Sequence, residues 1–245
     1  MSRGIDIVAE SSARMTAITA IMTAIVTLTT YIVQIPIPAT RGFFNIGDSM
    51  VYVSALLFGP YVGAFSGGVG SMLSDVLGGY LLYAPATLVI KGTEGAIVGL
   101  LSQRLSLGKF KSKGERKLVL TLLSTATFVV LTVANLLSVF YFAGSGILPS
   151  WLTDVVADPV FWLGFSLLVA VIIGLIASYA AYRSDFIVLF MLMGGALMVT
   201  GYFLYELILL GIAAVMEVPI NIMQVLSGIA IARPIYRGVS RATMS

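Results

Sequence analysis

The chain has 245 residues, of which 59% are hydrophobic and only 10% are charged, and its mean hydropathy is +1.04. Soluble domains carry about 25% charged residues, so this composition excludes an ordinary soluble fold and predicts an all-α polytopic membrane protein. The chain has no Cys and no His, which excludes disulfides, thiolate chemistry, imidazole metal ligands and Ser–His or Cys–His catalysis, and we expect no cofactor.

Apolar runs between helix breakers predict about eight transmembrane helices in a single membrane domain. In chain order they cover residues 16–35, 46–58, 60–76, 85–101, 118–142, 159–182, 186–213 and 219–236. Pro36 ends the first run, and Pro60 suits the first position of the third helix. The first 15 residues include Asp6, Glu10 and Arg14, which is not a signal-peptide pattern, so we expect the first run to be retained.

The second and third runs could form one kinked helix or two helices with a chain reversal at Pro60. The positive-inside rule favours the reversal, because it places Arg3, Arg14 and the basic cluster at 104–117 on the same membrane face. The net charge of +3 then reflects basic residues gathered on that face. We therefore expect a multi-pass protein of a prokaryotic cell membrane with both termini in the cytoplasm.

This orientation gathers the polar residues of the apolar runs toward the outer leaflet, which predicts a cup open to the outside. Ionisable groups at membrane depth are costly and mark a functional site. The candidate cup-lining residues are Asn45, Asp48, Tyr83, Lys91, Glu94, Tyr202, Glu206, Asn221 and Gln224, with Arg41 as a possible cap contact from an outer loop. Asp75 ranks lower, because it could cap the turn at Gly78 and Gly79. A pore or proton relay would instead need polar groups along its whole length.

The charged candidates have structural interpretations as well. Lys91 and Glu94 are three residues apart on one helix face, so they either form a pair that joins helices or contact a polar ligand. Asp48 is either a cap of the second helix or part of the site.

The remaining candidates also leave two interpretations open. Tyr202 could stack on a heteroaromatic ligand that Glu206 hydrogen-bonds, or the tyrosine could belong to an interfacial aromatic belt. Asn221 and Gln224 share one helix face, where they contact either a ligand or another helix.

Small residues predict close contacts between helices. The glycines of the third and fourth runs, such as Gly68, lie inside apolar spans with no strand before them, so they indicate helix packing rather than a nucleotide loop. On the first run, Ala20 and Ala24 form a small-xxx-small pair. That pair either packs within the chain or docks on a partner membrane protein.

Several short motifs together resemble the S component of an energy-coupling factor (ECF) vitamin transporter of the riboflavin-type group. They include Phe44-Asn-Ile-Gly-Asp48, Lys91-Gly-Thr-Glu-Gly95, Gly201-Tyr-Phe-Leu-Tyr-Glu206 and Glu217-Val-Pro-Ile-Asn-Ile-Met-Gln224. Each motif is weak alone, but their order and spacing are distinctive. The resemblance covers residues 16–104 and 186–237.

The resemblance implies a substrate-binding and translocation subunit for a vitamin-like small molecule, such as riboflavin or another heterocyclic vitamin or precursor. It also implies docking on a membrane coupling subunit, through Ala20 and Ala24, with two cytosolic ATPase subunits hydrolysing ATP. S components usually have six spans, so residues 118–182 are interpreted as an inserted two-helix hairpin whose outer connection is either a lid or peripheral.

A stand-alone proton-coupled secondary transporter remains the alternative function. It would use Asp75, Glu94 or Glu206 as the coupling carboxylate. We do not expect an enzyme, because the chain has no Gly-x-x-x-x-Gly-Lys-Ser/Thr pattern for ATP and lacks His and Cys.

Overall fold

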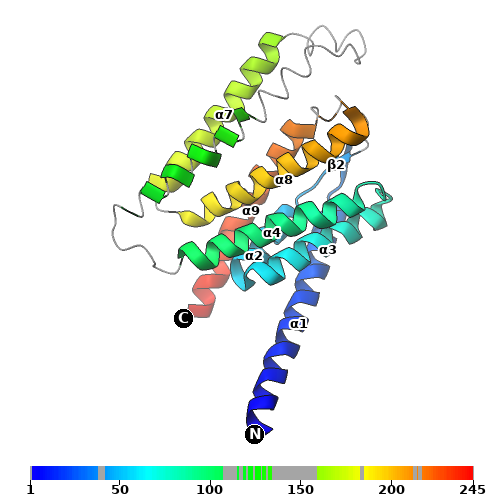
Figure 1. Ribbon diagram of the computed structural model, residues 1–245, viewed down its shortest axis with the longest axis vertical. Helices are drawn as coiled ribbons and strands as arrows, with labels where there is room; N and C mark the ends of the chain where they lie inside the picture. Colours follow the sequence, from blue (N-terminus) through cyan, green and yellow to red (C-terminus); the bar gives the residue numbers. More distant parts are fainter. Residues whose placement is uncertain are drawn as a thin grey trace.

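The computed structural model describes residues 2–37, 42–106, 159–182, 185–211, 214 and 217–244, together with scattered residues between 115 and 133. The elements of these residues are α1 (Ser2–Ile32), β1 (Ile35–Ile37), β2 (Gly42–Phe44), α2 (Asp48–Phe58), α3 (Pro60–Gly78), α4 (Ala84–Ser106), α7 (Pro159–Tyr182), α8 (Phe186–Leu210) and α9 (Glu217–Met244). The helices form a bundle, from which the N-terminal part of α1 extends away (Figure 1). The predicted all-α class is confirmed, with one short antiparallel strand pair added to it.

Helix α1 begins earlier than predicted, at Ser2. Its threonine hydroxyls form hydrogen bonds within the helix. Thr19, Thr23 and Thr30 each donate a hydroxyl hydrogen bond to the carbonyl four residues earlier, which lets them lie in apolar surroundings. The helix ends before Pro36, since a residue that precedes proline avoids the helical conformation. The following β1 and β2 pair Ile35 with Phe44, an element that the sequence did not predict.

The chain reverses between α2 and α3, as the positive-inside rule predicted. Gly59 has a φ of +87°, which glycine adopts without strain, and Pro60 begins α3. A Cβ placed on Gly63 would lie 2.7 Å from the Cβ of Ala55. In one continuous helix these two positions would be about 12 Å apart along the axis, so the kinked-helix alternative is wrong.

Helices α3 and α4 pack backbone against backbone at glycine positions. A Cβ on Gly68 would lie 2.6 Å from the carbonyl oxygen of Leu88 and 3.2 Å from the Cα of Gly92. Any larger residue at Gly68 would therefore force these helices apart. The interpretation of the glycines as packing residues is confirmed.

Four helices within the described residues are long and apolar enough to cross a membrane. They comprise Ser12–Ile32, Ala84–Leu105, Phe186–Leu210 and Glu217–Ala242. Helix α2 has 11 residues and is about 16 Å long, shorter than the roughly 30 Å hydrocarbon core. The count of eight spans therefore stays a prediction.

The inserted hairpin is described only in part. Its second helix is α7, whose bounds equal the predicted 159–182. Most of its first helix at 118–142, and the whole connection at 143–158, lie outside the described residues. The interpretation of this segment as an insertion stays a prediction too.

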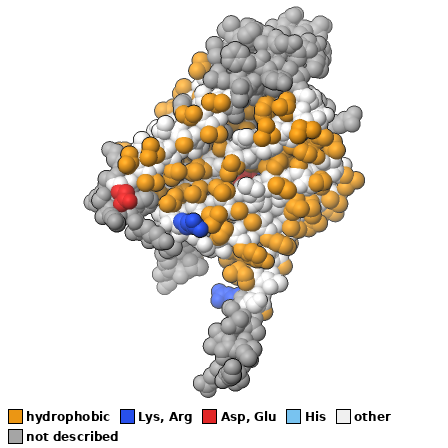
Figure 2. Space-filling model, viewed as in Figure 1, with side chains coloured by type: hydrophobic (Ala, Val, Ile, Leu, Met, Phe, Trp, Pro, Cys, Tyr) orange, Lys and Arg blue, Asp and Glu red, His pale blue; other side chains and the backbone are white. Residues whose placement is uncertain are grey.

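The surface of the bundle is strongly apolar. Figure 2 shows hydrophobic side chains spread over most of the described part of the visible face. Large side chains on different helices are well exposed, including Tyr61 on α3 at 66%, Val89 on α4 at 65% and Ile208 on α8 at 84%. Soluble monomers rarely expose apolar surface on this scale, whereas a lipid-facing exterior requires it.

The two ends of the bundle differ in their polar contacts. Helices α2, α4 and α9 begin at the end where α3 and α8 finish and where β1 and β2 pair. At the other end, Asp185 accepts hydrogen bonds from Arg233 and Arg237 at 2.8 and 2.7 Å, which joins the start of α8 to the last turns of α9. Helix α8 stops at Leu210, earlier than predicted, because Gly211 takes a φ of +59°. The candidate site lies at the first of these two ends.

Candidate ligand-binding site

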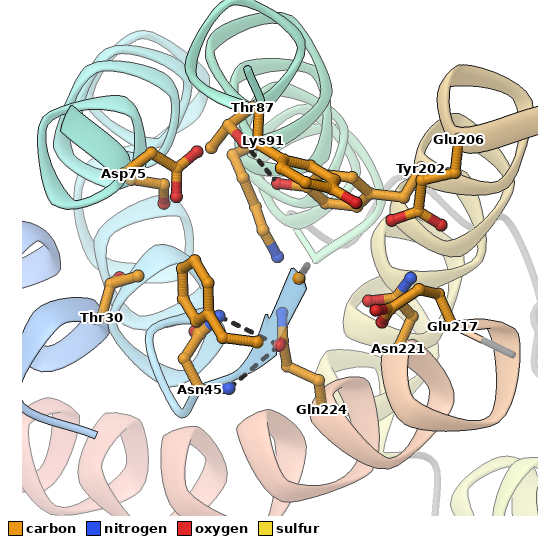
Figure 3. Close-up of a pocket in the computed structure, with 14 residues that line it drawn as sticks. Thr30, Asn45, Asp75, Thr87, Lys91, Tyr202, Glu206, Glu217, Asn221 and Gln224 are labelled. Carbon is orange, nitrogen blue, oxygen red and sulfur yellow. Dashed lines mark hydrogen bonds between the residues drawn. The ribbon is translucent and has the colours of Figure 1, made fainter. Parts of the chain in front are cut away.

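A small polar cavity of about 40 Å³ lies where α4 and α9 begin and α3 and α8 end (Figure 3). Its lining comes from α1, the β2 strand and the residue after it, α3, α4 with Tyr83 just before it, α8 and α9. The lining residues are Thr30, Gly42, Phe43, Asn45, Ser71, Asp75, Tyr83, Thr87, Lys91, Tyr202, Glu206, Glu217, Asn221 and Gln224.

Lys91 is the centre of a buried ionic network behind one wall of the cavity. Its ammonium pairs with Asp48 at the start of α2 and lies 3.2 Å from a carboxylate oxygen of Glu94 on its own helix. The other oxygen of Glu94 accepts a hydrogen bond of 2.8 Å from the Tyr52 hydroxyl. Asp48, Lys91 and Glu94 are at most 2% exposed, so the pairing offsets the cost of burying their charges.

Amide groups extend this network from α9 to the β2 strand. Gln224 donates from Nε2 to the second oxygen of Asp48 at 3.3 Å and accepts from both the backbone N–H and the side-chain amide of Asn45, at 3.2 and 3.0 Å. The side-chain oxygen of Asn45 accepts from the N–H of Gly47 at 2.8 Å, which fixes the turn into α2. Elements far apart in the sequence are thereby held together at one end of the bundle.

Close approach of α9 to α2 depends on a glycine. A Cβ on Gly228 would lie 2.9 Å from the Cβ of Asp48 and 3.1 Å from the ring of Tyr52. The missing side chain therefore lets α9 reach the ionic network.

Three aromatic side chains, those of Phe43, Tyr83 and Tyr202, line the cavity, and Figure 3 shows Tyr202 beside Thr87 and Lys91. The Tyr202 hydroxyl and the Thr87 hydroxyl are 2.9 Å apart, and the Lys91 ammonium lies 5.8 Å from the centre of the Tyr202 ring. The Tyr83 ring packs edge-on against Tyr205 at 6.1 Å. Burial, together with the nearby Glu206 carboxyl, raises the pKa of the Tyr83 phenol above its ordinary value, so this hydroxyl stays protonated and can donate a hydrogen bond.

Three carboxyl groups line the remaining walls. Figure 3 shows Asp75 on one side of the cavity and Glu206 with Glu217 on the opposite side. These residues are 2–3% exposed. Oδ2 of Asp75 and Oε2 of Glu206 are buried and accept no hydrogen bond from any residue that the structure describes. Groups of His, Cys, Asp and Glu arranged to hold a metal ion were not found among the described residues.

Comparison with known proteins decides the family. A family model described as "ECF-type riboflavin transporter, S component" matches residues 10–143 and 118–241. The chain belongs to this family. A relative from Pyrococcus woesei, described as "Uncharacterized protein in gap 3'region", is 60% identical over 78 residues, which make up 32% of this chain and 52% of the relative. This chain thus spans about half the length of that relative.

The predicted site residues of this S-component family member converge on one region. Seven of them line the cavity directly: Asn45, Tyr83, Lys91, Tyr202, Glu206, Asn221 and Gln224. Asp48 and Glu94 instead lie behind the cavity wall and hold Lys91, and the predicted pairing of Lys91 with Glu94 is present. Arg41 lies outside the described residues.

Sequence reasoning missed several lining residues that helical periodicity could have found. Thr87 precedes Lys91 by four residues on α4, so both share a face. Glu217 precedes Asn221 by four residues on α9 in the same way. Asp75, which ranked low as a turn cap, lines the cavity as well.

Other lining residues carried no such signal. Phe43 reaches the cavity from the unpredicted β2 strand, and its ring lies 4.4 Å from that of Tyr80. Thr30 resembles the other threonines of α1 in sequence, and only the packing of the helices singles it out.

Proposed function

We propose that this chain is the substrate-binding subunit of an ECF-type importer for a vitamin-like heterocycle, with riboflavin as the first candidate. The observation that carries the proposal is a buried polar cavity inside an apolar helical bundle whose sequence belongs to the S-component family. Polar groups at such depth are retained when they bind something polar. The cavity offers amides for the edges of a heterocycle, and the Tyr202 ring offers a stacking surface.

A ligand of vitamin size requires the lining side chains to move. Pockets that enclose drug-sized ligands measure about 300–1,000 Å³, far more than the 40 Å³ that is open here. Phe43 on β2, Tyr83 just before α4 and Tyr202 on α8 are the aromatic residues that line this space. We expect Phe43 to turn aside when a heterocycle binds, so that the Tyr202 ring can stack on it.

The exposed face of α1 supports docking on a membrane coupling subunit. Ala20 and Ala24 are exposed, whereas Thr19 and Thr23 are buried. On that buried side, a Cβ on Gly70 of α3 would lie 2.9 Å from the carbonyl oxygen of Thr23. Intramolecular packing therefore uses the threonine side of α1 and leaves the alanine side available for a partner.

In this proposal the chain supplies binding and translocation, and two cytosolic ATPase subunits supply ATP hydrolysis. The basic residues of the sequence favour an orientation with both termini in the cytoplasm of a prokaryotic cell. The cavity end would then face the outside, and the end with Asp185, Arg233 and Arg237 would face the cytoplasm.

The first test is native mass spectrometry and absorbance of the purified, detergent-solubilised chain. We expect a co-purified heterocycle of vitamin size, or a member of a vitamin panel that raises the melting temperature by several degrees. If no vitamin binds and solute uptake into vesicles follows a proton gradient without ATPase subunits, the stand-alone secondary transporter would be the better assignment.

A further inference from the structure

We propose that the ligand of this cavity is uncharged or cationic, and that it donates one hydrogen bond to Asp75 and another to Glu206 on the opposite wall. The inference rests on the proposed function and adds the chemical class of the ligand. It predicts that the site discriminates against phosphorylated or otherwise anionic forms of the same heterocycle.

The first observation is the pair of unsatisfied oxygens. Asp75 is 3% exposed and Glu206 is 2% exposed, and one carboxylate oxygen of each has no hydrogen-bond partner among the described residues. Buried polar atoms in native proteins are almost always hydrogen-bonded, and an exception calls for an explanation. Both side chains border the same cavity, from α3 and from α8. A ligand with O–H or N–H groups at both of its ends would satisfy both oxygens.

The second observation is the balance of charge around the cavity. The described lining contains three carboxyl groups, those of Asp75, Glu206 and Glu217, but Lys91 is its only lysine or arginine. That ammonium is already engaged by two further carboxylates, Asp48 and Glu94. Within the described lining, a phosphate or carboxylate on the ligand would therefore meet acids without a free cation to balance it, and like charges brought together out of water repel strongly.

The test compares two pairs of probes by their dissociation constants: riboflavin with riboflavin 5′-phosphate, and thiamine with thiamine monophosphate. For whichever of the two vitamins the wild-type chain binds, we expect the unphosphorylated form to bind about 100-fold more tightly than its phosphorylated form. In the double variant Asp75→Asn/Glu206→Gln that ratio should fall by about tenfold, because the amides keep the shape but lose the repulsive charge.

The single variants Asp75→Asn and Glu206→Gln carry the same test if the double variant does not fold. The matched control is Asp185→Asn, which makes the same chemical change at the other end of the bundle and should leave the ratio unchanged. Equal binding of phosphorylated and unphosphorylated probes would overturn the inference while the binding function stands. No binding of any probe, together with no vitamin found on the purified chain, would overturn the proposed function and this inference with it.

Discussion

Lys91 lies between Asp48 and Glu94 with only 2% of its surface exposed, and its removal would leave two carboxylates buried without a cation. An isolated buried charge costs far more than a paired one, and breaking a buried ion pair from one side typically costs about 3–5 kcal/mol. The network therefore contributes to the fold of the site before any ligand arrives. Under the proposed function, this one side chain would couple ligand binding to stability at the residue scale.

We predict that Lys91→Met lowers the free energy of unfolding by about 3 kcal/mol or more. Affinity for an identified ligand should fall more than tenfold, about 1.4 kcal/mol. Thermal unfolding in detergent and ligand titration measure the two effects. The triple variant Lys91→Met/Asp48→Asn/Glu94→Gln should regain much of the stability, since it leaves no unpaired charge. A single variant as stable as wild type would show that the network does not hold the site together.

Glu206 offers a separate test of the cavity, because it contributes to the lining without joining the lysine network. Glu206→Ala should weaken ligand binding more than tenfold, about 1.4 kcal/mol, while the melting temperature changes little. Calorimetric titration together with a melting curve separates the two quantities. Unchanged affinity in both Glu206→Ala and Lys91→Met would place the ligand elsewhere.

The site residues that the sequence could predict are those whose chemistry is unusual at membrane depth. Charged groups such as Lys91 and Glu206 stand out in apolar runs, and seven predicted residues indeed line one cavity. Whether such a group lines the cavity or supports it from behind, as Asp48 does, depends on how α2 and α9 pack, and composition does not contain that information. The threonines and Phe43 were missed because they are ordinary in membrane helices and short strands.

At the element scale, the glycines of α3 and α4 determine how closely the two helices approach. Backbone contact at Gly68 and Gly63 leaves no room for a side chain, and these helices carry Asp75 and Lys91 to the cavity. Because helices are stiff, separating the two backbones would shift both residues relative to each other. The packing thus has a direct effect on the geometry of the site.

We predict that Gly68→Leu destabilises the bundle by about 1–3 kcal/mol or prevents folding, because its side chain would meet the backbone of α4. Gly238→Leu on α9 is the matched control, because a Cβ there would have no heavy atom within 4 Å. Melting temperatures of both variants in detergent measure the difference. Equal stability of the two variants would contradict the close packing of α3 and α4.

The apolar runs predicted the positions of the described helices well but predicted several of their ends poorly. The bounds of α7 agree with the prediction, and the reversal at Pro60 was correctly inferred from charge. Helix α9 continues through Pro234 to Met244. The sequence prediction ended it at residue 236, because the polar last turns give no hydropathy signal. The β1–β2 pair was invisible because two strands of three residues lie below the length at which alternation can be recognised.

On the scale of the whole molecule, the described helices turn one side to the core and leave apolar and small residues exposed on the other. Helix α1 uses its threonine side for the core and leaves Ala20 and Ala24 exposed. Small residues let another helix approach closely, which makes this stripe suited to a coupling subunit. Neither Ala20 nor Ala24 lines the cavity, so under the proposed function we expect docking and ligand binding to be separable by substitution.

We predict that Ala20→Leu and Ala24→Leu abolish or strongly reduce vitamin uptake and co-purification with the coupling subunit, but leave the dissociation constant of the ligand within about twofold of wild type. Ser178→Leu, at an exposed position of α7, is the control and should change neither property. Loss of ligand binding in the alanine variants would instead assign this face to packing within the chain.

The narrowness of the cavity has a kinetic consequence. Because only about 40 Å³ is open, we expect rearrangement of the lining, rather than diffusion, to limit the association of a vitamin-sized ligand. In a stopped-flow experiment that follows flavin fluorescence, the observed rate should level off as ligand concentration rises, at the rate constant of opening. Once the lining has closed over the ligand, the same barrier opposes its escape. Under the proposed function, a slow gate of this kind would give the chain a long residence time for its ligand, so that a scarce nutrient would stay bound until partner subunits act on it.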